Sequence, residues 1–329
     1  MIISKTPFRV SFFGGGTDYP TWLDENEGFV LSTTIDKYCY ITLKELPSLF
    51  NYNYRIRYYL KEETKKISEI KHPVIRNLFK KYKIKKNIDL VHHSDLPAMS
   101  GLGSSSSFTV GLTNCLNIFN KISFSKYDLA HFAINFEQKV LKENVGCQDQ
   151  LAASYGGLNF YKLYKNNFKV YPINISNKNK LILEKSCFLL FTGFTRKASL
   201  LANDQIKRIP INSEYLKSMN ELTLDAVKLL ESKKLNLNLF FELINEQWDL
   251  KKRLSSSILP KKISLIIDQV QRAGVNSMKL LGAGGGGFIL CLVKPSLKNK
   301  VIQRLNSKYQ IVDIKFDNTG SHIIYNSGK

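Results

Sequence analysis

Cysteine, acidic residues and long apolar runs are all scarce in this sequence of 329 residues. The five cysteines are widely separated and include no C-x-x-C pair, so we expect reduced, buried thiols and no thiolate metal site. The longest apolar runs, Cys187 to Phe191 and Phe288 to Val293, are several-fold shorter than the roughly 20 residues of a membrane-spanning helix. Lys5 and Arg9 interrupt the apolar N-terminal stretch, and no small-x-small cleavage pattern follows. We therefore expect a cytoplasmic protein without a membrane partner.

The shortage of acidic residues leaves a strong positive charge. The chain has 48 Lys and Arg against 27 Asp and Glu, a net charge of +21. Such a charge attracts nucleic acid, acidic membranes or phosphorylated metabolites, and its sign alone does not choose among them. Because many lysines are scattered among polar residues, a solvated basic surface is the simplest interpretation. No interleaved aromatic and basic face can be demonstrated from the sequence, so nucleic acid is not an expected partner.

Composition and length indicate an ordinary folded protein. Hydrophobic residues make up 43% and charged residues 23% of the chain, and 329 residues are enough for about two domains. There is no internal repeat and no low-complexity linker, so the boundary is placed where the pattern changes. The sequence predicts two α+β domains, over residues 1–175 and 176–329.

Strand-like and helix-like patterns alternate along the chain. We expect strands at Ile2 to Phe13, Val30 to Leu43, Arg55 to Leu60, Ile88 to His93, Leu181 to Phe191, Phe288 to Val293 and Ile311 to Phe316. We expect helices over residues 104–119, 125–142, 150–155, 213–232, 236–255, 260–273 and 296–307. Ser125 and Asp128 have the spacing of a capping box at the start of the second helix.

Two of three glycine-rich stretches leave their chemistry open. In the first, the triple glycine at 14–16 follows a strand that carries Arg9 and precedes Thr17 and Asp18, so the backbone could approach a ligand. A glycine-rich hairpin turn would have the same pattern. In the third, residues 282–287 satisfy G-x-G-x-x-G, but a strand follows and no acidic residue lies near 20 positions further on. A dinucleotide-binding loop is therefore excluded.

The second stretch suits a polyphosphate. A strand ending at His93 leads through Gly101 and Gly103 into four serines, Ser104 to Ser107, which open an amphipathic helix. Unpaired amides and the positive end of the helix dipole would face an anion, and the hydroxyls could meet phosphate or magnesium. No lysine follows the last glycine, so this is not a Walker loop. Simple helix capping by the serines is the alternative.

Two acidic residues have unusual surroundings. Asp149 is a lone carboxylate between Gln148 and Gln150, and it could either face a ligand or cap the helix that follows. Glu137 lies on the flank of an apolar helical stripe, where a carboxylate needs a cation or a hydrogen-bond donor.

In this order and spacing, the three glycine stretches resemble the motifs of the GHMP small-molecule kinases over nearly the whole chain. The family motif P-x-x-x-G-L-G-S-S is matched between Pro97 and Ser105, and 282–287 match the third motif. The first stretch keeps much of the galactokinase pattern but has Gly15 and Gly16 where galactokinases have Glu and His, which puts galactose in doubt. The runs SFFGGGTDYP, VLSTTIDKY and FTGFTRKAS are most similar to the branch of the family that acts on heptose 7-phosphate.

The resemblance implies a two-domain α+β fold of the GHMP-kinase type. Its N-terminal domain would be a βαβ nucleotide-binding domain, its C-terminal domain ferredoxin-like, and the active site would lie between them. ATP and Mg²⁺ are the implied cofactors, and a sugar phosphate is the implied acceptor, phosphorylated on its anomeric hydroxyl to a 1,7-bisphosphate. A related sugar 1-kinase for an unphosphorylated hexose or deoxyhexose, or a non-catalytic sugar and ATP sensor, are the alternatives.

The resemblance also implies roles for individual residues. Asp149 would be catalytic with Arg9 beside it, favouring the ionised carboxylate, and Glu137 and Ser105 would hold the metal. The implied ATP-binding residues are Pro97, Ser100, Gly101, Leu102, Gly103, Ser104, Ser105 and Ser106. The implied acceptor-binding residues are Gly15, Gly16, Thr17, Asp18, Arg196, Lys197, Gly284 and Gly285. Arg196 and Lys197 would hold the acceptor's own phosphate, although plain surface charge also explains them.

Overall fold

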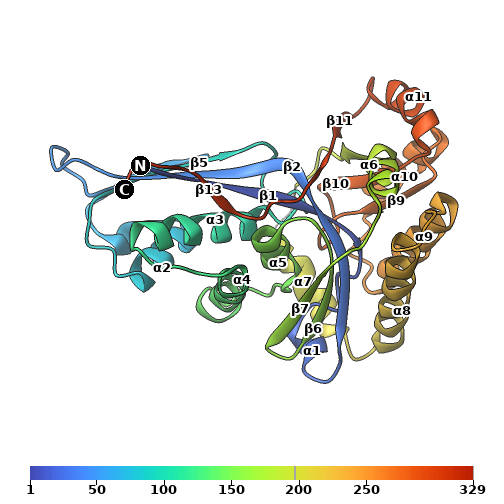
Figure 1. The fold of residues 1–329 in the computed structure, drawn as a ribbon, viewed down its shortest axis with the longest axis horizontal. Helices are drawn as coiled ribbons and strands as arrows, with labels where there is room; N and C mark the ends of the chain where they lie inside the picture. Colours follow the sequence, from blue (N-terminus) through green and yellow to red (C-terminus); the bar gives the residue numbers. More distant parts are fainter. Residues whose placement is uncertain (196–197, 329) are drawn as a thin grey trace.

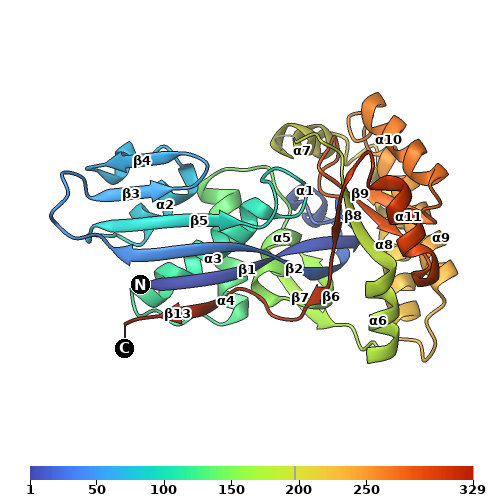
Figure 2. The same cartoon turned by 90° about the horizontal axis from the view of Figure 1, so that it is seen from above.

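The computed structural model describes residues 1–195 and 198–328. The molecule contains two β-sheets, each packed with its own helices. The long strands of the first sheet extend toward the second (Figures 1 and 2). The α+β class expected from the sequence is confirmed. Within the described residues, no helix combines the length and apolar character needed to cross a membrane.

The first sheet is built on two long antiparallel strands. Its strands are β1 (Ile2–Phe13), β2 (Gly28–Glu45), β3 (Tyr54–Arg57), β4 (Lys61–Thr64), β5 (Ile88–Ser94), β6 (Leu158–Tyr164), β7 (Asn167–Pro172), β12 (Phe316–Asp317) and β13 (His322–Asn326). The main path runs β13-β1-β2-β5-β3-β4, with β6 and β12 also paired to β2, and β7 paired to β6. Because β2 is so long, β5 pairs with its second half and β6 with its first half.

The helices of the first half lie against one face of this sheet (Figure 1). They are α1 (Pro20–Leu23), α2 (Pro73–Lys81), α3 (Ser104–Phe119), α4 (Lys126–Asn135) and α5 (Gln148–Tyr155), with a 3₁₀ turn η1 (Ile67–Glu69) and a π-helix η2 (Phe136–Val140). The parallel pair of β3 and β5 encloses α2, which supplies the expected βαβ unit. The capping box at α4 is confirmed, since Ser125 and Asp128 each bond the other's backbone amide.

The second sheet has the strand order of a ferredoxin-like domain. Its strands are β8 (Cys187–Phe191), β9 (Ser277–Leu280), β10 (Phe288–Leu292) and β11 (Gln310–Asp313), all antiparallel in the order β11-β8-β10-β9. Its helices are α6 (Asn177–Ser186), α7 (Ala198–Lys207), α8 (Ser213–Leu230), α9 (Leu237–Arg253), α10 (Lys261–Arg272) and α11 (Pro295–Leu305). Helices separate β8 from β9 and β10 from β11, which confirms the expected C-terminal architecture.

Three expected strands are partly wrong. The strand expected from Ile311 to Phe316 ends at Asp313 in β11, and Phe316 belongs to β12, which pairs with β2 in the first sheet. Residues 181–186 belong to helix α6, and only Cys187–Phe191 form a strand. The helix begins at an N-cap, Ser176, whose hydroxyl accepts a hydrogen bond from the amide of Asn179. The expected strand from Arg55 to Leu60 ends at Arg57, because the chain turns there into β4.

The core confirms what the sequence predicts for cysteine. All five cysteines are buried and unpaired, within packed apolar clusters.

The expected division at residue 175 separates the second sheet from the first, but β12 and β13 return to pair with β2 and β1. The end of the chain therefore lies beside its beginning (Figure 1).

Candidate active site

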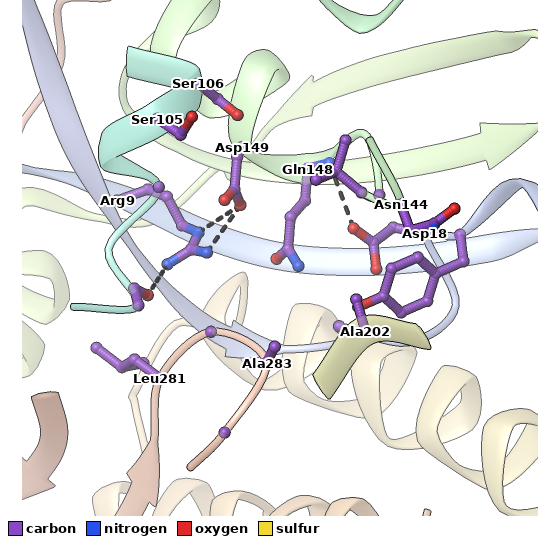
Figure 3. Close-up of a pocket in the computed structure, with 18 of the residues that line it drawn as sticks. Arg9, Asp18, Ser105, Ser106, Asn144, Gln148, Asp149, Ala202, Leu281 and Ala283 are labelled. Atoms are coloured by element: carbon purple, nitrogen blue, oxygen red, sulfur yellow. Dashed lines mark hydrogen bonds and ion pairs between the residues drawn. The ribbon is translucent and has the colours of Figure 1, made fainter. Parts of the chain in front are cut away.

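A cavity of about 360 Å³ lies where all three glycine stretches meet (Figure 3). The expected site residues on its wall are Arg9, Gly15, Gly16, Asp18, Gly101, Gly103, Ser104, Ser105, Ser106, Glu137, Asp149 and Gly284. These residues come from both halves of the chain. The cavity therefore lies between the two halves, as expected for an active site shared by two domains.

Arg9 holds Asp149 at the cavity wall. Its Nε donates to Oδ1 of Asp149 at 2.8 Å, and its Nη2 lies 2.8 Å from the same oxygen. Its Nη1 donates to the carbonyl oxygen of Gly101, so the guanidinium also holds the loop of residues 95–103 that leads into the serines of α3, called the serine loop below. The Arg9 side chain is 4% exposed and that of Asp149 is 27% exposed. Both contacts with Arg9 use Oδ1, which leaves Oδ2 available to a ligand in the cavity (Figure 3).

Asp149 does not act as the cap of its helix. Helix α5 begins at Gln148, two residues earlier than expected, and its N-cap is Cys147 without a side-chain cap bond. Asp149 therefore lies in the first turn, where the helix dipole favours a negative charge. Its carboxylate is directed to Arg9 and the cavity.

The serine loop delivers the N-terminus of α3 to the cavity. The N-cap of α3 is Gly103, whose φ of 76° is left-handed and which makes no side-chain cap bond. The amides of the first turn of a helix have no intrahelical partner, and the dipole adds positive potential, so this 16-residue helix offers an anion site. A Cβ at Gly103 would lie 3.3 Å from Oδ2 of Asp149. The anion site and the carboxylate are therefore neighbours.

Glu137 is buried beside the same helix end. It lies in η2, a π-helical turn of the kind often found at functional sites, and it is 1% exposed. Its Oε2 accepts hydrogen bonds from the Ser106 hydroxyl at 2.9 Å and from the Gln150 amide. Burial raises the pKa of Glu137 to about 7. Its Oε1 is buried without a hydrogen-bond partner.

The Glu137 carboxylate and the serine hydroxyls fit a magnesium ion. Mg²⁺ prefers oxygen ligands and is usually held by one or two carboxylates together with phosphate oxygens. The Oε1 atom of Glu137 is such an oxygen ligand, and it is buried without a hydrogen-bond partner. Ser106, rather than the expected Ser105, contacts Glu137, while Ser105 lies exposed on the cavity wall. Among the described residues there is no cluster of three or more His, Cys, Asp or Glu that could hold a metal by itself.

Asp18 is wedged between the first glycine stretch and the start of α5. It is 2% exposed, and its Oδ1 accepts the amide of Gly16 at 2.9 Å while Oδ2 accepts that of Gln148 at 3.5 Å. Burial raises the pKa of Asp18, and the charge of Asp149 raises it further. A buried carboxylate with two backbone donors is fixed in place, which suits orientation of a polar ligand.

The third glycine stretch packs directly on the serine loop. A Cβ at Gly282 would lie 2.7 Å from Cα of Gly101, and one at Gly287 would lie 2.2 Å from the carbonyl oxygen of Ser100. The amide of Phe288, the first residue of β10, donates to that same carbonyl at 3.0 Å. The glycines are therefore required by close backbone contact between the two halves, and the strand that follows confirms that this is no dinucleotide loop.

Some expected site residues do not lie on the cavity wall, namely Pro97, Ser100, Leu102, Thr17 and Gly285. Ser100 donates its hydroxyl to the Pro97 carbonyl at 2.7 Å, and Leu102 is fully buried in the core. Thr17 donates to the Phe29 carbonyl at 3.1 Å. These side chains shape the loops that carry the wall.

The two residues expected to bind the acceptor's phosphate, Arg196 and Lys197, lie outside the described residues.

Sequence reasoning missed several polar residues on the wall: Asn144, Gln148, Gln150, Gln205 and Lys251. Lys251 is 5% exposed, and its Nζ donates to the Gly282 carbonyl at 2.8 Å. Burial lowers the pKa of Lys251 to about 8. Its signal in the sequence is positional, because Phe240, Ile244 and Gln247 precede it at helical spacing on the buried side of α9.

The chain matches two family models, described as the GHMP kinases N terminal domain over residues 68–157 and GHMP kinases C terminal over residues 226–311. Together they cover more than half of the chain. It is 29% identical to the D-glycero-alpha-D-manno-heptose 7-phosphate kinase of Campylobacter jejuni, over 97% of each chain. It is 25% identical to the galactokinase of Clostridium perfringens, over 72% of this chain and 70% of the other.

Solved structures share the fold. The crystal structure of a D-glycero-D-manno-heptose 1-phosphate kinase from Bacteroides thetaiotaomicron superposes with a TM-score of 0.81 at 24% identity, covering 99% of this chain and 100% of that one. With both halves matched, and with the motif residues gathered around one cavity, the chain belongs to the GHMP kinase family and its reaction is phosphoryl transfer.

Proposed function

We propose that this kinase transfers the γ-phosphate of ATP to the anomeric hydroxyl of D-glycero-D-manno-heptose 7-phosphate, giving the 1,7-bisphosphate for nucleotide-activated heptose biosynthesis. The observation that carries the proposal is the position of Asp149. It is held by Arg9 and faces the cavity beside Gly103, at the N-terminus of α3. An anion site for the triphosphate and a proton acceptor for the sugar are thereby side by side.

The chemistry needs only a modest base. The anomeric oxygen attacks the γ-phosphorus, the bond from that phosphorus to the β,γ-bridging oxygen breaks, and ADP leaves with the bond's electron pair. The hydroxyl proton goes to Asp149. Because charge in a loose phosphoryl-transfer transition state is spread over the transferred group, proton removal can come late, and orientation matters more than basicity.

The phosphates would be held mainly by backbone. Ser104 and Ser105, in the first turn of α3, line the cavity, and glycines at 101 and 103 allow a close approach to the first-turn amides. Glu137 and a serine hydroxyl would hold Mg²⁺, which supplies neutralisation of charge on the transferred phosphoryl group. Together these groups supply what the lysine of a Walker loop supplies elsewhere.

The acceptor is inferred from the relatives. Two of them carry heptose phosphates in their names, and the one from Campylobacter jejuni aligns over 97% of both chains. Similarity to galactokinases and to fucokinase-containing enzymes supports the second candidate, a sugar 1-kinase for a free hexose or deoxyhexose. Asp18, fixed at the cavity wall, would orient acceptor hydroxyls in either case.

An acceptor screen tests the proposal. ADP release from ATP is measured with heptose 7-phosphate, hexose 6-phosphates, free heptose and free hexoses, and the product is identified by phosphorus NMR. Heptose 7-phosphate should give the highest kcat/KM and a bisphosphate product with phosphate on the anomeric oxygen. Faster turnover of a free hexose would favour the second candidate, and no turnover with any sugar would leave only the sensor alternative.

A further inference from the structure

Within the part of the chain that the structure describes, one cation on the cavity wall has no counter-ion. Among the described residues that line it, Arg9 and Lys251 are the positively charged ones, and Arg9 is already paired with Asp149. Lys251 donates to the carbonyl oxygen of Gly282 at 2.8 Å, and within residues 1–195 and 198–328 it forms no ion pair. An ammonium has three N–H donors. Lys251 therefore retains donors for a ligand in the cavity.

The space beside Lys251 is kept open by a glycine. A Cβ at Gly15 would lie 3.3 Å from Nζ of Lys251 and 3.5 Å from Nε2 of Gln148, so any side chain there would enter the space between them. The Nε2 group of Gln148, which is the atom nearest this space, carries two donor hydrogens that suit an anion, whereas its buried Oε1 could only accept. A polar recess is therefore bounded by an ammonium and an amide, both with unused hydrogen-bonding capacity.

This recess lies on the acceptor side of Asp149. In Figure 3 the Gln148 side chain lies between Asp149 and Asp18, on the side of Asp149 away from Ser105 and Ser106. Both Gly15 and Lys251 line the same cavity. A triphosphate on the serine loop would leave this side free for the group that receives the phosphoryl.

Electrostatics favour an anion in the recess. Lys251 is 5% exposed, and removing an ammonium from water is costly unless a negative charge meets it. Asp18 and Asp149 favour its charged form, whereas Arg9 opposes it. Asp149 is paired with Arg9, and Asp18 accepts backbone amides, so neither is dedicated to Lys251. A ligand phosphate would supply the missing counter-charge.

We propose that Lys251 binds the phosphate that the acceptor already carries, with the Gln148 amide as its hydrogen-bonding neighbour. The inference rests on the proposed function, because it requires a phosphorylated acceptor. It assigns selectivity to Lys251: a free sugar leaves the ammonium without a counter-ion, whereas a sugar phosphate forms charge-assisted hydrogen bonds with it.

The test compares Lys251→Met with Lys252→Met. Lys252 is the next residue of α9, pairs with Asp249 at 2.6 Å and does not line the cavity, so its variant loses the same charge without touching the recess. For both variants, KM and kcat are measured with ATP, with heptose 7-phosphate and with free heptose. Lys251→Met should raise KM for heptose 7-phosphate at least about 30-fold, as expected for loss of a buried charge-assisted contact. KM for ATP and for free heptose should stay within about 3-fold, and Lys252→Met should resemble the wild type.

Each other outcome has a distinct meaning. Equal losses with both acceptors would overturn the assignment in favour of a structural role through Gly282, and a lower kcat with unchanged acceptor KM would reassign Lys251 to the transferred phosphoryl group. A wild type that turns over free sugars alone rejects the proposed function, and the assignment with it. A wild type that prefers heptose 7-phosphate, with the preference kept in Lys251→Met, rejects the assignment alone. Thermal unfolding checks the fold, and if Lys251→Met does not fold, Lys251→Gln is compared in the same way alongside the pH profile of the wild type.

Discussion

At the scale of single residues, the ion pair between Arg9 and Asp149 links the two proposed functions of the site, which are proton acceptance and phosphate binding. Arg9 bonds Oδ1 of Asp149 and the carbonyl of Gly101, so one buried guanidinium fixes both the proposed proton acceptor and the loop before α3. A charge-assisted pair of this kind sets orientation as well as charge. A single side chain thereby joins Asp149 to the loop that we propose binds the phosphates.

Replacing Asp149 by asparagine tests this arrangement. The amide keeps the shape of the carboxylate but cannot accept the hydroxyl proton, so kcat should fall at least about 10²-fold. Affinity for ATP, measured by isothermal titration calorimetry, should change by less than about 3-fold, because the α3 amides are untouched. Asp249→Asn, at an exposed pair with Lys252, is the matched control and should leave both values unchanged. Near-normal turnover in Asp149→Asn with affinity kept would remove Asp149 from the mechanism.

If Lys251 binds the acceptor's phosphate, KM for heptose 7-phosphate should depend on pH in a definite direction. Burial lowers its pKa from 10.5 to about 8, Asp18 and Asp149 oppose that shift, and Arg9 adds to it. Burial also lowers the pKa of Lys279, which is buried nearby, well below its ordinary value. As pH rises through about 8, Lys251 loses its proton, so KM for heptose 7-phosphate should rise while KM for free heptose stays flat. Lys251→Arg keeps its charge and should flatten the profile; a wild-type KM that is constant from pH 7 to about pH 9.5 would contradict the assignment.

At the scale of elements, two glycine loops from opposite halves of the chain are in close backbone contact. Gly101 and Gly282 approach so closely that a Cβ on either would meet the backbone of the other loop at 2.7 Å or less. Both have positive φ, 83° and 73°. The candidate anion site at α3 is therefore in contact with a glycine loop from the second half of the chain.

Gly282→Ala should show how much this contact matters. Gly193 has nearly the same backbone angle, φ 77° against 73°, but a Cβ there has nothing within 4 Å. Gly193→Ala should thus lose only the left-handed penalty, about 1 to 2 kcal/mol, in free energy of unfolding. Gly282→Ala adds a backbone clash, so it should lose at least about 1 kcal/mol more and lower kcat/KM for ATP. Equal stability and equal kinetics in the two variants, from urea unfolding and initial rates, would show that the loops adjust freely.

Local sequence patterns predict the elements that carry the phosphate site better than those around it. Helix 104–119 is confirmed to the residue, because an apolar stripe and a glycine-serine start agree. The apolar residues 181–183 favour a strand over residues 181–186, but these residues belong to α6. Leu181 is 48% exposed, whereas Leu183 and Ser186 are buried at helical spacing. The N-cap at Ser176 was a usable signal there.

Lys251 shows a different limit of sequence reasoning. A lysine on the buried stripe of α9 is visible in the sequence, but the loops that surround it come from residues 15 and 282, more than 30 positions away along the chain. Local periodicity does not specify such distant pairings. The resemblance to a family identified the three motifs, and only the fold shows what lies between them.

At the scale of the whole molecule, the end of the chain packs against α5, the helix that carries Asp149. The amide of Ser321 donates to the Ala153 carbonyl at 2.7 Å, and its hydroxyl lies 2.8 Å from that of Thr6 in β1. β13 then pairs with β1. The local pattern of residues 318–326 does not predict that this segment pairs with β1, because the partner of a strand depends on the tertiary fold. The last strand and the two residues before it thereby connect β1, which carries Arg9, with the far end of α5, which carries Asp149.

Gly320→Ala tests whether this distant contact reaches the active site. A Cβ at Gly320 would lie 2.1 Å from the Ser154 carbonyl oxygen in the last turn of α5, so the helix or the C-terminal segment must shift. Overpacking of this kind costs about 1 to 3 kcal/mol, which lowers Tm by roughly 1.5 to 4.5 °C in a chain of this size. Gly328→Ala is the matched control, since its Cβ would meet only Asn326 Oδ1, at an ordinary 3.5 Å. If α5 moves as a unit, kcat should fall in Gly320→Ala by less than in Asp149→Asn, with KM for ATP unchanged, because α3 keeps its place. A lower Tm with an unchanged kcat would show that the strain stays at the C-terminal end of α5 and that the Arg9–Asp149 pair is set by the glycine loops alone.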